Sequence, residues 1–294
     1  MAIAASGGVQ VAPDDYFDRH EVYVGMDVGG REIVVATEHV AAYVAGTATV
    51  DIPSGYAPAL VYHSEVYRSL DWYLPNIVGN LQTRQEWDLF FPMSVGDTVR
   101  SHSTVVDRYR KRDRLYVVNE VLFTDANGRW LQRSRTHQSF LAGSPKGEVV
   151  VDREREQQSD RRFRVGDGDG EEISTSPRTI TLAMCGAFSG PGKNYHNDRE
   201  MARALGFPDI VVQGMMSICF LSDVLTRQYG LGWYRGGKLD VRLVNVVWVD
   251  ETLTPHCKVR ERVREGTHHR VFLDVWCAKA DGTVAAVGTA SALE

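Results

Sequence analysis

β-Branched and apolar residues gather in four runs of the chain, separated by charged or glycine-containing turns. The runs cover residues 99–106, 115–124, 253–263 and 271–278. In each half, a charged turn (YRKRDR or REGTHH) joins two runs, and the second run leads to Asn127-Gly128 or Asp281-Gly282. These dipeptides supply the positive φ angles of a type I′ turn, so we expect an antiparallel hairpin and then a third strand in each half.

The two halves repeat each other at an offset of 154 residues. Residues 96–128 align with residues 250–282 without a gap, and Thr98 with Thr252, Arg108 with Arg262 and Gly128 with Gly282 are identical pairs. Identity at this density over such a length indicates a tandem duplication.

A helical stretch precedes each set of strands. Residues 214–230 are apolar on nearly all sides, which is typical of a buried helix, and residues 63–76 are the counterpart in the first half. A buried helix wrapped by a curved antiparallel sheet is the hotdog arrangement, so the chain is predicted to be an α+β double hotdog. We expect one repeat in residues 1–145, a charged surface linker in 146–164 and a second repeat in 165–294. A sheet continuing from one repeat into the other would hide an edge strand of each.

Composition narrows the class of protein. The net charge is −5 with mixed signs, which argues against nucleic-acid binding, and no apolar run reaches the roughly 18 residues of a membrane span. The start of the chain lacks the basic region of a secretory signal. The four cysteines lie far apart and the nine histidines lack metal-ligand spacing, so we expect reduced thiols, a cytoplasmic protein and no metal site.

Candidate chemistry concentrates in residues 188–216, FSGPGKNYHNDREMARALGFPDIVVQGMM. A Gly/Pro/Asn loop leads to Asp198, a predicted N-cap for a short helix that ends at Gly206. An extended segment then enters the buried helix at Gly214, whose N–H could polarise a carbonyl. His196 lies where the loop meets the short helix. A histidine bonded only to backbone and a glycine needed for packing are the alternative interpretations.

This stretch resembles the MaoC-like, or (R)-specific enoyl-thioester hydratase, family, whose loop reads G-D-x-N-P-x-H before an A-x-x-x-G helix end and a (H/Q)-G-M helix start. The matching positions are Gly190, Asn194, His196, Asp198, Ala202, Gly206, Gln213, Gly214 and Met215. The resemblance implies a His and an Asp that activate water, and a helix-start N–H that holds the thioester oxygen. It also implies an N-terminal repeat that lacks the motif and helps to house the acyl chain.

The aspartate of the motif is missing, because Pro191, or Gly192 if one residue is deleted, stands in its place. We therefore expect His196 to act as acid and base, alone or with Tyr195 or Asn194 orienting water. Gly214 would be the oxyanion donor. The other residues expected to contact substrate are Gly192, Gln213 and Met215.

The expected function is hydration or dehydration of an enoyl- or 3-hydroxyacyl-thioester. Coenzyme A or phosphopantetheine would belong to the substrate, with no separate cofactor, and an acyl carrier protein and a second copy of the chain are candidate partners. Two alternatives remain open. One is a lyase, isomerase or cyclase of specialised acyl or polyketide metabolism, and the other is a non-catalytic acyl-thioester-binding subunit.

Overall fold

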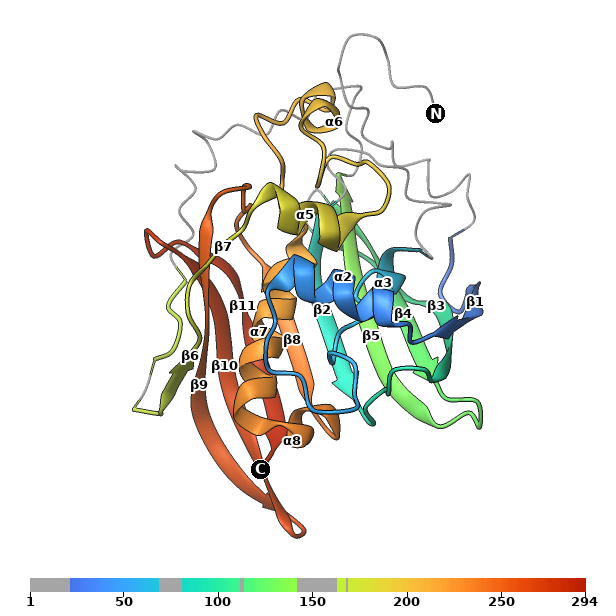
Figure 1. Cartoon of the computed structure of the whole chain (residues 1–294), viewed down its shortest axis with the longest axis vertical. Helices are drawn as coiled ribbons and strands as arrows, with labels where there is room; N and C mark the ends of the chain where they lie inside the picture. Colours follow the sequence, from blue (N-terminus) through green and yellow to red (C-terminus); the bar gives the residue numbers. More distant parts are fainter. Residues whose placement is uncertain (1–21, 69–80, 112–113, 142–162, 168) are drawn as a thin grey trace.

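Eleven strands form one antiparallel sheet in the computed structural model, which describes residues 22–68, 81–111, 114–141, 163–167 and 169–294 (Figure 1). The strands are β1 (Asp27–Val34), β2 (Leu81–Leu89), β3 (Thr98–Lys111), β4 (Arg114–Thr124), β5 (Trp130–Leu141), β6 (Glu172–Ser174), β7 (Arg178–Thr179), β8 (Lys238–Leu243), β9 (Thr252–Glu265), β10 (His268–Lys279) and β11 (Val284–Leu293). The helices are α2 (Thr37–Thr47), α3 (Glu65–Arg68), α5 (Leu182–Ser189), α6 (Arg199–Ala204), α7 (Gly214–Tyr229) and α8 (Leu231–Tyr234).

The strand order repeats the sequence duplication. It runs β1-β3-β4-β5-β2 through the first half and then β8-β11-β10-β9-β6 through the second, with β7 also paired to β9. Strands β9, β10 and β11 each begin 154 residues after β3, β4 and β5. The two halves therefore have the same topology, and the strand order of the second half is the reverse of the first, starting from their junction.

Strands β2 and β8 form this junction, with Arg84 opposite Arg242 and Trp87 opposite Leu239. An ion pair between Arg84 and Asp240, at 2.6 Å, crosses it. The expectation that one sheet continues into the other is thus confirmed. Neither strand was among the predicted elements, although KLDVRL alternates between polar and apolar residues.

The hairpin turns differ from the prediction. Gly128 has a φ of +79° and Gly282 of +83°, but Asn127 does not have the positive φ that a type I′ turn also requires. Instead, Asp125 and Arg129 close a three-residue loop through a bond from the Asp125 N–H to the Arg129 carbonyl. The Asp125 side chain accepts the N–H groups of Asn127 and Arg129. Lys279 and Thr283 close the same loop in the second hairpin. The type I′ prediction was wrong because a three-residue loop needs only one residue with positive φ, which the glycine supplies.

The strands of the outer hairpins are also longer than expected. Strand β3 reaches Lys111 and β9 reaches Glu265, so charged residues predicted as turns extend the ladder instead. The second half of β9 is exposed, which is why its sequence lacks an apolar face.

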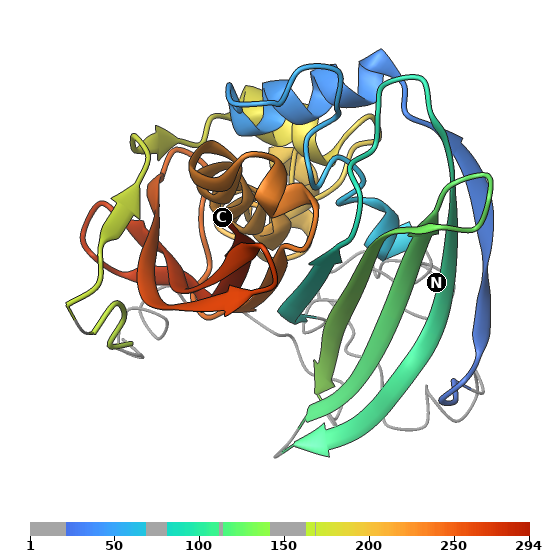
Figure 2. The ribbon, with the colours of Figure 1, turned by 90° about the horizontal axis from the view of Figure 1, so that it is seen from below.

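Helix α7 fills the curve of the C-terminal strands, and every residue from Met215 to Thr226 is buried (Figure 2). The predicted buried helix is confirmed. Its counterpart is described only as α3: residues 63 and 64 form a turn before it, and residues 69–76 of the predicted helix lie outside the described residues. Most of the predicted linker at 146–164 also lies outside them.

Helices α2 and α5 pack side by side across the two halves (Figures 1 and 2). Gly46 permits this contact, because a Cβ there would lie 2.8 Å from the Cβ of Phe188. All four cysteines are buried free thiols, as expected.

A buried ion pair of the second half is also hydrogen-bonded to the first half. Arg178 Nη1 lies 2.6 Å from Asp223 on α7 and donates to the Thr47 carbonyl at 2.8 Å. Thr49 donates its hydroxyl to the same carboxylate at 2.7 Å. Burial raises the pKa of Asp223, while Arg178 and Thr49 act in the opposite direction. Residues from both repeats thus satisfy one buried carboxylate.

Candidate functional site

Two asparagines shape the loop between α5 and α6. Asn194 donates its amide to the Ser189 carbonyl at 2.8 Å and accepts the N–H of His196 at 2.9 Å. Asn197 donates to the Gly192 carbonyl at 2.9 Å and accepts the N–H of Asn194 at 2.8 Å. Short polar side chains that bond to nearby backbone stabilise such turns without a regular element. Asn194 therefore orients the backbone that carries His196.

His196 is tied to the segment that leads into α7. Its Nδ1 lies 2.7 Å from the Val211 carbonyl oxygen, and since a carbonyl only accepts, Nδ1 carries the proton. In the neutral ring, Nε2 is then the acceptor. Burial lowers the pKa of His196 to about 4, although the bond to Val211 acts in the opposite direction. The side chain is thus a neutral imidazole at pH 7 with a fixed tautomer.

Tyr195 packs against the same histidine. Its ring centroid lies 4.0 Å from that of His196 and 5.5 Å from that of Phe207. Burial raises the pKa of Tyr195 to about 12, so the phenol stays protonated.

Helix α7 begins at Gly214, directly after the extended Gln213. Gly214 lies three residues beyond Val211, the partner of His196, so the histidine and the helix start belong to one local structure. The first N–H groups of a helix have no carbonyl partner inside it. A Cβ at Gly214 would lie 2.3 Å from Cδ1 of Leu243, which places the helix start against β8. The predicted Gly214 helix start is confirmed.

The other predicted contact residues differ in their surroundings. Met215 is fully buried in the core. Gln213 has a buried side-chain oxygen with no hydrogen-bond partner among the described residues. Gly192 is exposed, with open space where a Cβ would lie.

Asp198 is the carboxylate nearest in sequence to His196, and it is engaged elsewhere. It caps α6 by accepting the Met201 N–H at 3.0 Å and pairs with the exposed Lys193 at 2.8 Å. Lys193 and the Met201 N–H lower the pKa of Asp198. The predicted cap is confirmed. Within the described ranges, the hydrogen bonds of His196 go to Asn194 and Val211 and to no carboxylate.

A tyrosine of the first half packs against the same core as Tyr195, and the sequence did not single it out. Burial raises the pKa of Tyr67 well above its usual value. The Tyr67 hydroxyl donates to Gln82 at 2.6 Å. Tyr67 belongs to the predicted helix at 63–76, and nothing in one repeat alone shows that it packs on a core shared with the other.

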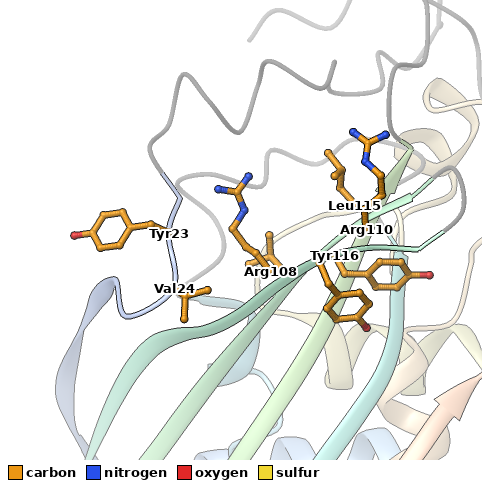
Figure 3. A pocket seen from close by; sticks show the side chains of 8 residues that line it. Tyr23, Val24, Arg108, Arg110, Leu115 and Tyr116 are labelled. Carbon is orange, nitrogen blue, oxygen red and sulfur yellow. The ribbon is translucent and has the colours of Figure 1, made fainter.

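The basic hairpin forms a separate surface hollow of about 440 Å³ (Figure 3). Its lining comes from β3, β4 and the segment before β1, and includes Tyr23, Val24, Arg108, Arg110, Leu115 and Tyr116. Arg108 donates to the Val22 carbonyl, and Tyr109 stacks on Tyr116 with centroids 4.6 Å apart. Arg108 therefore helps to hold the segment before β1 against the sheet.

The described residues contain no group of three or more His, Cys, Asp or Glu side chains arranged to hold a metal ion. No helix in the same part of the chain is long and apolar enough to cross a membrane.

No protein-family model matches the chain, and no curated protein sequence matches it. Solved structures do. A MaoC-like dehydratase is 16% identical with a TM-score of 0.67 over 92% of this chain and 98% of the other. A MaoC-like dehydratase from Phytophthora capsici is 15% identical with a TM-score of 0.67, covering 92% and 95%. A conserved hypothetical protein from Mycobacterium tuberculosis, described as a double hotdog, is 14% identical with a TM-score of 0.61, covering 98% of both chains.

These similarities define the fold. The chain is an α+β double hotdog, and its fold is that of MaoC-like dehydratases, which confirms the predicted resemblance at the level of structure. The activity does not follow from identities this low, since one fold hosts many functions.

Proposed function

We propose that the protein is a hydratase or dehydratase acting on an enoyl- or 3-hydroxyacyl-thioester, with His196 as its acid and base. The observation that carries the proposal is the bond from His196 to the Val211 carbonyl. It leaves Nε2 as an acceptor and ties the imidazole to the segment that enters α7 at Gly214. A base beside a helix start is what hydration of a conjugated thioester requires.

In the hydration direction, Nε2 of His196 removes a proton from water while the water oxygen bonds to Cβ of the substrate. The electron pair of the double bond moves toward the thioester, and the N–H of Gly214 donates to the resulting enolate oxygen. The imidazolium then gives its proton to Cα and the thioester carbonyl forms again. A pKa of about 4 makes the imidazolium a strong acid, which favours this second transfer.

The neighbouring residues have supporting roles in this proposal. Tyr195, whose hydroxyl stays protonated, orients the water, and Asn194 holds the loop in place. Gly192, Gln213 and Met215 flank the thioester. Coenzyme A or the phosphopantetheine of an acyl carrier protein is part of the substrate, so no separate cofactor is required. A cytoplasmic homodimer is part of the same proposal.

A second candidate is a protein that binds acyl thioesters without hydrating them, or that carries out another lyase, isomerase or cyclase reaction. One observation favours it: Pro191 and Gly192 occupy the place of the expected aspartate, and Asp198 is paired with Lys193. Loss of one of two acid–base groups commonly costs a factor of about 10² to 10⁴ in rate.

The test compares wild type with His196→Ala on crotonyl-CoA and longer enoyl-CoA substrates, with the exposed His268→Ala as the matched control. We expect kcat/KM to fall by a factor of about 10² to 10⁴ in His196→Ala and to be unchanged in the control. Wild-type kcat/KM should decline only as the pH falls toward about 4. Full activity in His196→Ala would refute the proposed role, and acyl-CoA binding without turnover in wild type would favour the second candidate.

A further inference from the structure

The two repeats differ on the face of their strands that is turned into the fold. Side chains two residues apart share a face, and on β5 that face carries Gln132, Ser134, Thr136 and Gln138. All four are buried. At the offset of 154 residues, β11 carries Ala286, Gly288, Ala290 and Ala292, and its alanines belong to the apolar core around α7. The same difference occurs on the neighbouring strands: Asn119 on β4 corresponds to Leu273 on β10 at the same offset, and both are buried.

A hydrogen-bonded chain runs from α3 to this polar face. The Tyr67 hydroxyl donates to Gln82 at 2.6 Å. Gln82 donates to Gln85 at 2.9 Å, and Thr136 donates to the same Gln85 oxygen at 2.7 Å. Gln85 and Thr136 face each other across β2 and β5, and neither is exposed to solvent. Polar groups are therefore continuous from α3 through β2 to β5.

Three further polar atoms on this face have no partner among the described residues. They are Nε1 of Trp87, Oε1 of Gln132 and Oγ of Ser134, each on a side chain at most 2% exposed. Trp87 and Ser134 stand opposite each other in the β2–β5 register. Leaving a buried polar group unpaired costs about 1–3 kcal/mol. One N–H donor, one carbonyl acceptor and one hydroxyl together match a hydroxyl or keto group of a ligand.

The position of these atoms suits the chain of an acyl group whose thioester lies at α7. Gly214 lies against Leu243 at the end of β8, and Trp87 pairs with Leu239 of the same strand. Four residues along a strand span about 13 Å. The unpaired atoms are therefore roughly one medium-length acyl chain from the helix start.

We propose that the polar face of the first repeat binds an oxygen-bearing acyl chain, so that the preferred ligand is a hydroxylated or keto-bearing acyl thioester. This inference rests on the proposed function in one respect, the placement of the thioester at Gly214. The inference specifies the substrate class as oxygen-bearing acyl thioesters, because a plain fatty acyl chain would leave the polar side-chain atoms of Trp87, Gln132 and Ser134 without hydrogen-bond partners.

The experiment uses pairs of medium-chain enoyl-CoA compounds that differ only by a hydroxyl or keto group in the distal half of the chain. Turnover is measured on the enoyl forms, and binding of the saturated forms is measured by calorimetry. We expect the oxygenated member to be favoured about tenfold in kcat/KM and in Kd, as one added hydrogen bond would give. Ser134→Ala and Gln132→Leu should each reduce this preference.

Ser103→Ala is the matched control, since Ser103 is a buried hydroxyl of the same repeat that already bonds to Asn119. It should leave the preference unchanged. Equal binding of both compounds, or a preference that survives both substitutions, would overturn the inference and leave water as the partner of these groups. Turnover of both compounds without a preference for the oxygenated one would refute this inference and leave the hydratase proposal intact. Tighter binding of the oxygenated compound without turnover of either would support this inference and refute the hydratase proposal.

Discussion

His63→Gln is expected to change how the stability of the protein depends on pH. The His63 ring is 5% exposed and stacks on Phe188 with centroids 3.9 Å apart. Its Nε2 lies 3.4 Å from the Phe188 carbonyl, and its Nδ1 has no partner in the described part of the chain. Burial lowers the pKa of His63 to about 4. The neighbouring Tyr43 has a pKa raised well above its usual value, so it stays neutral in this range.

The magnitude follows from linkage. The unfolded chain binds a proton at His63 with a pKa of about 6.5, and the native state does so only near 4. The unfolded state therefore holds more protons between these values, and the free energy of unfolding falls as the pH drops through this window. At 1.36 kcal/mol per unit, the full effect is about 3.4 kcal/mol, of which about 2 kcal/mol is lost between pH 7.5 and 5.

The assay is urea unfolding of wild type and His63→Gln at about pH 7.5 and 5. The substitution removes the titrating ring and keeps a hydrogen-bond donor, so wild type should lose about 2 kcal/mol more than the variant on acidification. Carboxylates and His196 titrate in both proteins and cancel in the comparison. Phe188→Leu is the control, because it removes the stacking partner and leaves the imidazole. It should lower stability at both values of pH. If wild type and His63→Gln lose the same stability on acidification, His63 is not held neutral by burial and the reasoning fails.

Two further predictions concern carboxylates. Arg178→Met leaves Asp223 buried without its cation and should lower the free energy of unfolding by about 3–5 kcal/mol in a urea titration. Arg100→Met at the exposed pair with Glu32 should cost far less, and equal losses would contradict the reasoning that burial makes the Arg178–Asp223 pair costly to break. Asp198→Asn retains a side-chain acceptor for the α6 cap and removes the negative charge. We therefore expect kcat to remain within about threefold of wild type. A loss of kcat by a factor of about 10² or more would identify Asp198 as the second catalytic group.

The duplication made most of the fold predictable from the sequence. The meanders at 98–141 and 252–293 and the buried helix at Gly214 follow from apolar runs, turn residues and one constant offset. Strands β2 and β8 were missed although the offset of 154 residues also relates 84–89 to 238–243, because only Leu89 and Leu243 are identical there and LQTRQE does not alternate between polar and apolar residues. The hairpin turn was misassigned because a three-residue loop needs only one residue with positive φ, which Gly128 or Gly282 supplies.

The sequence predicted the local elements of the candidate site but not the contacts between residues that are distant in the chain. The loop, the Asp198 cap and the Gly214 helix start lie within one stretch, and local signals locate them. The bond from His196 to Val211 spans 15 residues and requires the extended segment to return beside the loop. Tyr67 comes from the other repeat, and only the packing of the two halves places it on the core that Tyr195 also contacts.

A polar inner face on the first repeat requires that other contacts help to hold that repeat in place. A hotdog repeat on its own depends on an apolar face against its helix, as β11 shows with its buried alanines. In this chain the halves also share a continuous sheet through β2 and β8, the contact of α2 with α5, and the bonds of Thr47 and Thr49 to the buried Arg178–Asp223 pair. These contacts add to the apolar core, so the packing of the first repeat does not depend on β5 alone. Its inner face carries Gln132, Ser134 and Thr136 where β11 carries alanines and a glycine, which is the difference that a polar acyl chain would require.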